Sequence, residues 1–403
     1  MQKRNFLLSS LALAVSCQVT SALAQKKYDP GASDTEIKIG QTMPYSGPAS
    51  AYGVIGKVQA GYFKMINEQG GVNGRKINFI SLDDGYSPPK TVEMVRRLVE
   101  QDEVLLLMNT LGTPSNTAIH RYVNSKKVPH LFLATGASKW NDPKRYPWTI
   151  GFNTNYHSEG MLYAKDILKN KPNAKIGVLV QNDDYGKDYL NGFKEGLGDK
   201  AKTMIISEVT YEVTDPTIDS QIVTLKGSGA DTFFNITTPK FAAQAIRKVD
   251  DIGWKPTHYL NQVSASIGSV LKPAGVEKAV GVVSMQYIKD PTEKRWENDP
   301  TMKEFLAFMK KYVPDASPED ANTTYGYAVA QLMVHVLKQA GDNLTRENIM
   351  KVVANIKNHQ IPMAIPGVLA NTSPDDFALF QMMQLIKFDG KTWVPYGEPT
   401  AVK

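Results

Sequence analysis

The chain has almost no cysteine and no long apolar run. Its single cysteine, Cys17, lies within the first twenty of 403 residues. With one thiol no internal disulfide can form, so core packing has to supply the stability. No apolar run approaches the roughly 20 residues that a helix needs to cross a bilayer. These two absences exclude a disulfide-stapled scaffold and a multi-span membrane protein.

The chain also lacks clustered charge of one sign. It has 46 Lys and Arg against 40 Asp and Glu, a net charge of +6, and no basic run longer than a pair such as Lys26-Lys27. A surface groove that binds nucleic acid needs a row of basic side chains, so we expect no nucleic acid partner. With 42% hydrophobic and 21% charged residues, the composition is typical of a globular protein of about two domains.

The common catalytic and cofactor motifs are missing as well. No GxGxxG follows a predicted strand, and GxxxxGK[ST], GxSxG and HExxH do not occur. The six histidines have no metal-ligand spacing. We therefore expect no enzyme, no catalytic residue, no metal and no cofactor. One alternative remains, a secreted α/β hydrolase whose nucleophile and base converge without a motif.

The N-terminus has the pattern of a secretory signal. Lys3 and Arg4 precede an apolar run of about ten residues, Phe6 to Val15, and Ala22-Leu23-Ala24 is typical of a cleavage site. We predict a signal peptide over residues 1–24 and an exported mature protein, which the family resemblance given below implies is periplasmic. Cleavage would remove Cys17 and lower the net charge from +6 to +4.

A lipoprotein is the competing interpretation of this segment. Ala14-Val15-Ser16-Cys17 is similar to a lipidation box, which would keep Cys17 as the anchor. The residue three before the cysteine is Ala, where such boxes usually have Leu. We therefore favour a secreted protein over one that is lipidated at Cys17.

From residue 36 onward, β-branched or aliphatic runs alternate with amphipathic stretches. This alternation predicts βα units around parallel sheets, in two successive series, and hence an α/β fold. The predicted strands of the first series are 37–43, 77–82, 104–108 and 130–134, and those of the second are 175–180, 204–209, 231–236, 258–261 and 281–285. Asp215 and Pro216 are predicted to cap and begin one of the second set of helices.

The last third of the chain changes pattern. Helices are predicted over 300–312, 321–340 and 345–356, followed by a proline-rich segment at 361–367 and an alternating tail at 377–388. This order fits a chain that returns to complete the first lobe and then the second. We predict lobes of 34–151 with 290–361 and of 152–289 with 362–403.

Three loops at the ends of the first-lobe strands share a composition. Residues 45–53, 109–117 and 134–138 supply hydroxyls and backbone N–H groups next to predicted helix N-termini. Open parallel sheets bind ligands at this edge, and helix N-termini favour anions. The loops therefore predict a carboxylate site, with simple capping loops as the alternative.

Several segments resemble the leucine-binding-protein family, the periplasmic substrate-binding proteins of ABC importers. The similar segments are Ile37 to Gly53, Ile66 to Lys76, Asp83-Asp84, Asn182 to Gly186 and Thr323 to Ala330. The resemblance implies a type I periplasmic-binding-protein fold, with two Rossmann-like lobes joined by a hinge of three crossings. It also implies a monomer that delivers a small molecule to a permease and ATPase complex in the inner membrane. The crossings are expected near 151–153, 286–290 and 361–366.

The resemblance also implies site residues. By position, Tyr52 matches the aromatic wall, Thr113 the hydroxyl for the ligand carboxylate, Ala134 a backbone contact and Tyr185 the closing aromatic of the second lobe. Tyr45 is a further candidate for the wall. Other positions depart from the family: Gly136 stands where a second hydroxyl is usual, although Thr135 or Ser138 could replace it, and Thr238 stands in place of a tyrosine. Val263 replaces the glutamate that pairs with the ligand ammonium.

The missing glutamate bears on the ligand. No Asp or Glu occurs from Ile252 through Val276. The one other candidate partner for a ligand ammonium is Asp183 or Asp184, next to the predicted closing aromatic Tyr185. Because an unpaired buried ammonium costs about 3 to 5 kcal/mol, an acid without an amino group fits better. We favour an aromatic or phenylpropanoid carboxylate, with a branched-chain amino acid as the alternative. A periplasmic ligand sensor would use the same closing cleft.

Overall fold

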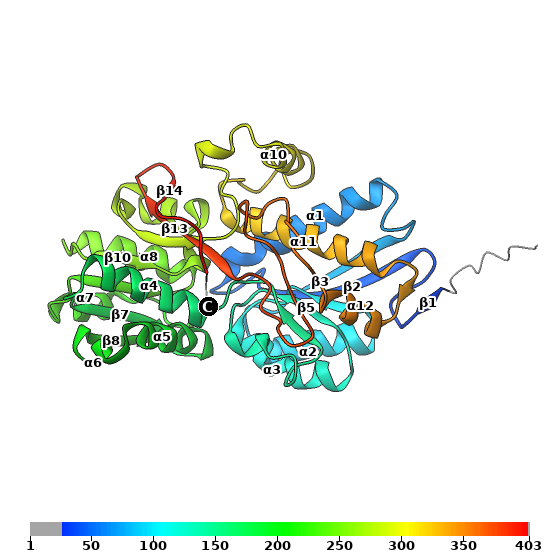
Figure 1. Cartoon of the computed structure of the whole chain (residues 1–403), viewed down its shortest axis with the longest axis horizontal. Helices are drawn as coiled ribbons and strands as arrows, with labels where there is room; N and C mark the ends of the chain where they lie inside the picture. The colour runs from blue at the N-terminus through cyan, green and yellow to red at the C-terminus, as the bar shows by residue number, and fades with distance from the viewer. Residues whose placement is uncertain (1–25, 402–403) are drawn as a thin grey trace, which may run out of the picture.

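A computed structural model describes residues 26–401 of the chain as two α/β lobes side by side (Figure 1). The first lobe contains a five-stranded sheet in the order β3-β2-β4-β5-β6, in which all neighbours are parallel. Its strands are β2 (Glu36–Met43), β3 (Lys76–Asp83), β4 (Leu106–Met108), β5 (His130–Leu133) and β6 (Thr149–Gly151). The helices between these strands are α1 (Gly53–Glu68), α2 (Pro88–Glu100) and α3 (Thr113–Ser125).

The second lobe contains a larger, mixed sheet in the order β14-β13-β11-β10-β9-β7-β8, with β15 paired to β13. Its parallel strands are β7 (Ile176–Gln181), β8 (Ile205–Tyr211), β9 (Thr232–Ile236), β10 (Thr257–Leu260) and β11 (Val283–Gln286). The antiparallel strands are β13 (Met382–Phe388), β14 (Trp393–Pro395) and β15 (Thr400–Ala401). The helices are α4 (Tyr156–Asn170), α5 (Asp184–Leu197), α6 (Ala201–Met204), α7 (Asp219–Gly227), α8 (Pro239–Asp251) and α9 (Lys272–Ala274).

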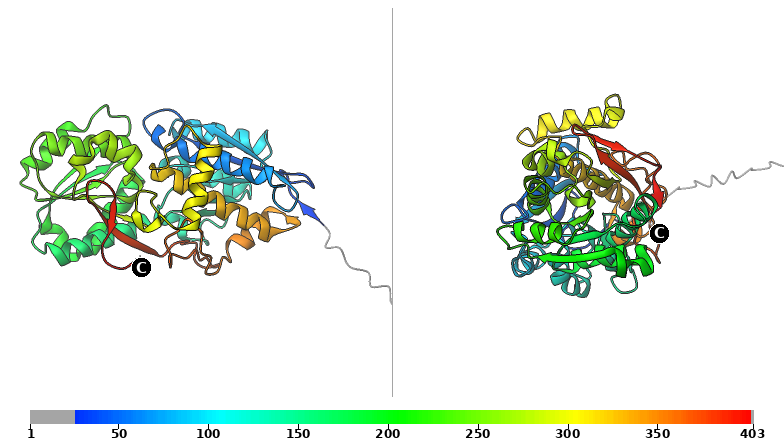
Figure 2. Two further views of the ribbon diagram at one scale, coloured as in Figure 1. Left: turned by 90° about the horizontal axis from the view of Figure 1, so that it is seen from above. Right: turned by 90° about the vertical axis from the view of Figure 1, so that its left-hand side faces the viewer.

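Between these two strand sets the chain returns to the first lobe. The returning helices are α10 (Pro300–Tyr312), α11 (Ala321–Ala340) and α12 (Arg346–Val353). Helices α10 and α11 pack against α1, and β12 (Asn343–Leu344) pairs with β1 (Lys27–Tyr28). Figure 2 shows the consequence from above: the yellow and orange helices lie with the blue first lobe, and the red terminal strands lie with the green second lobe.

The hinge lies where these segments pass between the lobes. Two of the predicted crossings run beside each other as extended chain: Ile365 N donates to Tyr287 O at 3.0 Å and Lys289 N donates to Met363 O at 2.9 Å. Ile288 and Ala364 form an antiparallel bridge between them. The α/β fold of two lobes with parallel sheets and a multi-crossing hinge is therefore confirmed.

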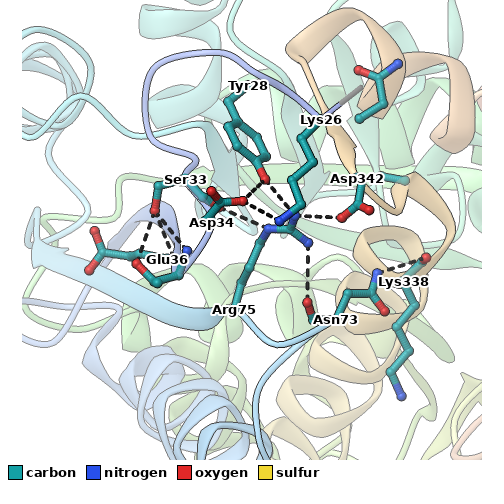
Figure 3. A network of polar contacts seen from close by, with 12 residues as sticks. Lys26, Tyr28, Ser33, Asp34, Glu36, Asn73, Arg75, Lys338 and Asp342 are labelled. Atoms are coloured by element: carbon teal, nitrogen blue, oxygen red, sulfur yellow. Dashed lines mark hydrogen bonds and ion pairs between the residues drawn. The ribbon is translucent and has the colours of Figure 1, made fainter. Parts of the chain in front are cut away.

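A buried arginine ties the outer end of the first lobe together (Figure 3). The side chain of Arg75 is 2% exposed, and its guanidinium donates to Tyr28 Oη at 2.7 Å and to the Asp342 carboxylate at 2.6 Å. Its Nε donates to Ser33 O at 3.0 Å. Because buried charge is stable only when paired and hydrogen-bonded, this cluster fixes the N-terminal strand and the turn before β12 to the start of β3.

Two local predictions are wrong. Helix α7 begins at Asp219 rather than Pro216, because the Asp215 carboxylate accepts from Glu212 N at 2.8 Å and closes a turn after β8. The tail is a strand only from Met382 onward. Leu379 and Phe380 are both buried, and two neighbouring inward side chains break the alternation that a strand of one buried face requires.

The predicted signal peptide and the lipidation box at Cys17 lie outside the described residues. The predicted lobe limits stay a prediction.

Candidate ligand-binding site

A cavity lies between the two lobes. Its volume is about 70 Å³. The wall consists of Tyr52, Ile55, Tyr86, Leu111, Gly112, Thr113, Ala134, Asn153, Tyr156, Tyr185, Thr238, Gln262, Val263, Ser266, Ala321, Asn322 and Tyr325. Among the described residues that line the cavity, none has a charged side chain. The cavity suits a small molecule with a largely apolar body.

Tyrosines form most of the aromatic wall. Tyr156 contacts Tyr185 edge-on, with ring centroids 5.4 Å apart, and stacks on Tyr189 behind the wall at 4.5 Å. Burial raises the pKa of Tyr52, Tyr156 and Tyr185 above the ordinary value of tyrosine. All three hydroxyls are therefore neutral hydrogen-bonding groups at any physiological pH.

Hydrogen bonds hold these rings in place. Tyr185 Oη donates to Thr237 O at 3.0 Å and accepts from Asn261 Nδ2 at 2.8 Å. Tyr52 Oη, from the first lobe, donates to Val263 O of the second lobe at 3.2 Å. Because a buried hydroxyl with partners has few alternative positions, the rings of Tyr52 and Tyr185 are held in place while the lobes are in contact.

Helix capping explains why Tyr185 lies at the cavity. Asp183 caps α5, and its carboxylate accepts from the backbone N–H groups of Tyr185 and Gly186 at 3.0 and 3.1 Å. Tyr185 thus occupies the first turn of a helix that begins at the carboxyl end of β7, where parallel sheets place ligand contacts.

The opposite side of the cavity contains the N-terminus of α3. Gly112 precedes this helix with φ 99°, and a Cβ at this position would lie 2.5 Å from the Tyr86 ring. Thr113 begins the helix, and its hydroxyl lies 2.7 Å from that of Thr135. Helix N-termini carry partial positive charge and unpaired N–H groups, so this end of the cavity favours a carboxylate.

The structure brings six of the sequence-predicted residues to the cavity wall. These are Tyr52, Thr113, Ala134, Tyr185, Thr238 and Val263. Their roles in binding stay predictions.

The other four predicted residues lie outside the wall. Tyr45 turns away and its hydroxyl lies 2.6 Å from Ser81 Oγ, while Thr135 lies behind Thr113. A Cβ on Gly136 would lie 2.1 Å from Thr154 O, so the backbone packs there too closely for a side chain. Ser138 Oγ donates to the Asp188 carboxylate of the second lobe at 2.7 Å.

Some lining residues escape sequence reasoning. Gln262, Ser266 and Asn322 come from irregular segments and a helix start, and nothing in their local pattern marks a site. Tyr86 and Tyr325 could have been predicted from the family resemblance. Tyr86 follows the Asp83-Asp84 doublet, and Tyr325 lies within the similar segment Thr323 to Ala330.

Carboxylates surround the wall without joining it. Asp183 caps α5, and Asp184 pairs with Lys139 of the first lobe at 2.9 Å. Asp320 accepts from Ser266 Oγ at 2.9 Å behind the wall. A ligand ammonium in the cavity would therefore meet hydroxyls, amides and backbone carbonyls rather than a carboxylate.

Glu159 is the buried acid directly behind Gln262. It is fully buried, and its carboxylate accepts from Gln262 N at 2.8 Å, Tyr189 Oη at 2.7 Å and Tyr163 Oη at 3.0 Å. Burial raises its pKa to about 7, although the three donors oppose the shift. Glu159 thus titrates near neutral pH while it supports two segments of the wall.

This raised pKa predicts a pH effect on stability. An acid with an ordinary pKa of 4.5 in the unfolded chain and about 7 in the folded one binds more protons when folded, so it makes the protein less stable as pH rises through that range. Between pH 5 and 7 the loss should be about 2 kcal/mol. Urea unfolding of wild type and Glu159→Gln at both pH values should show wild type losing stability relative to the variant. A difference that stays constant with pH would contradict this prediction.

The described lobes are in contact across the cleft. Besides the Tyr52, Ser138 and Lys139 contacts, Gly268 N donates to Glu319 O at 3.0 Å, and Lys272 forms an ion pair with Glu319. These contacts between the lobes describe a closed conformation.

Within residues 26–401, no helix is both long and apolar enough to cross a membrane. The same residues contain no group of three or more His, Cys, Asp or Glu arranged to hold a metal ion.

Solved structures show which class of protein this fold defines. A branched-chain amino acid ABC transporter protein from Thermus thermophilus, solved with bound valine, has a TM-score of 0.82, 16% identity and coverage of 92% of this chain and 97% of the other. A fatty acid ABC transporter substrate-binding protein from Thermomonospora curvata has a TM-score of 0.77, 22% identity and coverage of 93% and 95%. The architecture is that of the type I periplasmic binding proteins.

A family model for periplasmic binding proteins matches residues 36–391, so the chain belongs to this family. Among curated relatives, a Leu/Ile/Val-binding protein homolog of Brucella suis is 25% identical over 329 residues, covering 79% of this chain and 82% of the relative. An amino acid binding protein of Pseudomonas aeruginosa is 23% identical over 358 residues, covering 85% and 87%. The predicted membership of the leucine-binding-protein family is confirmed.

Membership implies the general role. Such proteins are extracytoplasmic and deliver a small molecule to the permease of an ABC transporter. The relatives and structural neighbours described above are binding and transport proteins.

Proposed function

We propose that this protein is a periplasmic receptor, without enzymatic activity, that binds a small carboxylate with an aromatic or other apolar body and delivers it to an ABC permease. The observation that carries the proposal is the composition of the cavity wall: several tyrosines, a helix N-terminus with a threonine hydroxyl, and no charged side chain among the described lining residues.

The two ends of the cavity bind different parts of the ligand. The carboxylate is held by Thr113 at the N-terminus of α3, while Tyr52, Tyr156 and Tyr185 enclose the apolar body. Aromatic rings contribute about 0.5 to 1.5 kcal/mol per well-placed contact beyond the area they bury. Since Tyr52 and Tyr185 belong to different lobes, a ligand between them stabilises the closed form over the open one.

An amino acid is the competing ligand. It is favoured by the valine in the Thermus thermophilus neighbour and by the names of the curated relatives. A ligand ammonium would have to be satisfied by Ser266, Asn322 and backbone carbonyls. Without a carboxylate partner this costs about 3 to 5 kcal/mol.

A thermal-shift screen tests the proposal. Aromatic and aliphatic carboxylic acids are compared with the twenty amino acids on the mature protein. A true ligand at 100 times its dissociation constant adds about 2.7 kcal/mol to the free energy of unfolding. Stabilisation by acids that have no amino group supports the proposal, and stabilisation by amino acids alone overturns it.

Position 263 gives a sharper prediction about the amino group. Val263→Glu should restore the missing carboxylate and raise the affinity for leucine by about tenfold or more, because a charge-assisted hydrogen bond replaces an unpaired ammonium. The same change should weaken the binding of an acid without an amino group. Isothermal titration with both ligands measures the two changes.

Val263→Gln is the matched control, since it has nearly the same size and no charge. An equal response of leucine binding to the two substitutions would show that position 263 does not face the ligand ammonium.

A further inference from the structure

Part of the cavity wall is a direct contact between the two lobes. Ser266 belongs to the second lobe, whereas Ala321 and Asn322 begin α11 of the first lobe, and all three line the cavity. Ser266 directly precedes the helical turn Ile267–Leu271, which packs with α8 of the second lobe. The start of this turn and the start of α11 therefore meet at the cleft.

The Asp320 carboxylate joins the two helix starts. It caps α11, where its Oδ1 accepts from Asn322 N at 3.1 Å. The same oxygen accepts from two hydroxyls of the second lobe, Ser266 Oγ at 2.9 Å and Ser269 Oγ at 3.0 Å. Hydrogen bonds to a carboxylate are about twice as strong as those between neutral groups. We call Ser266, Ser269 and Asp320 the clasp.

The clasp leaves the Ser266 hydroxyl no capacity for a ligand. A hydroxyl can donate one hydrogen bond and accept two. Ser266 Oγ donates to Asp320, and it accepts from Ala321 N and from Ser269 N, each at 3.2 Å. Asn322 also uses its side-chain donors here, because its Nδ2 donates to Asp320 at 2.9 Å and to Ser269 Oγ at 3.3 Å. The polar groups of this part of the wall thus bind each other.

The backbones of the two lobes also approach closely beside the clasp. Gly268 N donates to Glu319 O at 3.0 Å. A Cβ on Gly268 would lie 2.8 Å from Asp320 N, and the three atoms nearest to it all belong to the backbone of Glu319 and Asp320 in the first lobe. A side chain at position 268 would therefore obstruct the first lobe only when the cleft is closed.

The contact between Ser138 and Asp188 repeats this chemistry with the lobes exchanged. Ser138 N and Oγ, in the first lobe, donate to the two Asp188 oxygens of α5 at 2.8 and 2.7 Å. Ser138 is a sequence-predicted ligand hydroxyl, but in the closed form its hydroxyl is engaged by the other lobe. Hydrogen bonds to carboxylates thus connect the closed lobes at two separate sets of residues.

We propose that the clasp positions the lobes around a bound ligand and sets the affinity of every ligand by the same factor, without selecting among ligands. The affinity of a ligand that closes a cleft depends on its own contacts and on the equilibrium between the open and closed forms. The clasp acts on that equilibrium, because its residues bind each other. The proposal rests on the proposed function only in that a ligand closes the lobes, whatever the chemistry of that ligand.

Ser269→Ala and Gly268→Ala test the clasp by independent means. The first removes a hydrogen bond to Asp320, and the second adds a methyl group that meets the first-lobe backbone. Neither position is among the described residues that line the main cavity. Isothermal titration uses benzoic acid, 3-phenylpropanoic acid, leucine and valine as probes. Each substitution should weaken every probe that binds wild type by about tenfold, with less than about threefold difference between probes.

Stopped-flow kinetics distinguishes the clasp from a general loss of structure. The open form lacks the clasp, so the association rate should stay as in wild type. The dissociation rate should rise by the factor by which the affinity falls, because opening of the cleft releases the ligand.

Ser228→Ala and Gly227→Ala are the matched controls. Ser228 Oγ donates to Leu225 O within the second lobe, and a Cβ on Gly227 would contact nothing within 4 Å, so both variants should bind as wild type does. Unchanged affinity in both test variants, or losses that differ by more than about tenfold between probes, overturns the clasp and leaves the receptor standing. If leucine and valine bind and the two acids do not, the carboxylate proposal fails, and the clasp is judged on the two amino acids.

Discussion

Replacing Tyr185 with alanine should weaken ligand binding by more than a hundredfold, about 3 kcal/mol. The ring forms part of the cavity wall and packs edge-on against Tyr156 and Tyr189 at 5.4 and 5.6 Å. Its hydroxyl also accepts from Asn261 Nδ2 and donates to Thr237 O. Truncation removes the ring contact and leaves buried polar groups unpaired. Isothermal titration with the best ligand from the screen measures the loss.

Two further variants separate these contributions. Tyr185→Phe keeps the ring and loses the hydroxyl, so about tenfold of the affinity should be lost. Tyr122→Ala removes a partly exposed tyrosine of α3 that bonds to Glu100 away from the cavity, and should leave affinity unchanged. Near-wild-type binding by Tyr185→Ala would remove this residue from the site.

Replacing Gly192 with alanine should lower the free energy of unfolding by about 3 kcal/mol or more. Helices α4 and α5 cross so closely that a Cβ on Gly192 would lie 1.8 Å from His157 O. The obstacle is backbone, which cannot rotate away as a side chain can. Because α4 contains Tyr156 and α5 contains Tyr185, separation of the helices would also displace two rings of the wall. Urea unfolding followed by circular dichroism measures the change.

Gly227 is the matched control for this substitution. It also lies in a helix of the second lobe, α7, but a Cβ there would contact nothing within 4 Å. Gly227→Ala should therefore leave the stability unchanged or raise it by up to about 1 kcal/mol. If Gly192→Ala is equally harmless, the helices are not held at this distance.

Much of the fold follows from local pattern. The strand at 176–181 was predictable because it is a short, mostly apolar run that is buried in a parallel sheet. Helix α11 was predictable to the residue, since its apolar positions extend around most of its surface and Gly341 ends it. The pattern failed where a carboxylate closes the preceding turn instead of capping the next helix, as at Asp215, or where an irregular chain enters the core, as at Leu379 and Phe380.

The residues of the site were harder to predict from the sequence than the fold. Tyr52, Thr113 and Tyr185 lie at the carboxyl ends of strands, at helix starts that local signals mark. Gln262 and Asn322 reach the same cavity from segments sixty residues apart in the chain, and no local signal relates them. Gly136, which stands where the family usually has a second hydroxyl, lies where the backbone leaves no room for a side chain, and only the packing reveals this.

The sequence by itself determined the two α/β series, their interrupted order and the lack of an acid from Ile252 through Val276, because periodicity, capping and composition are local properties of the chain. The tertiary structure decided which tyrosines line the cavity and which lie in the core. It also decided that a second, smaller cavity lies at the hinge. Cavities exist only where distant segments fail to fill the space between them, and that depends on packing in three dimensions.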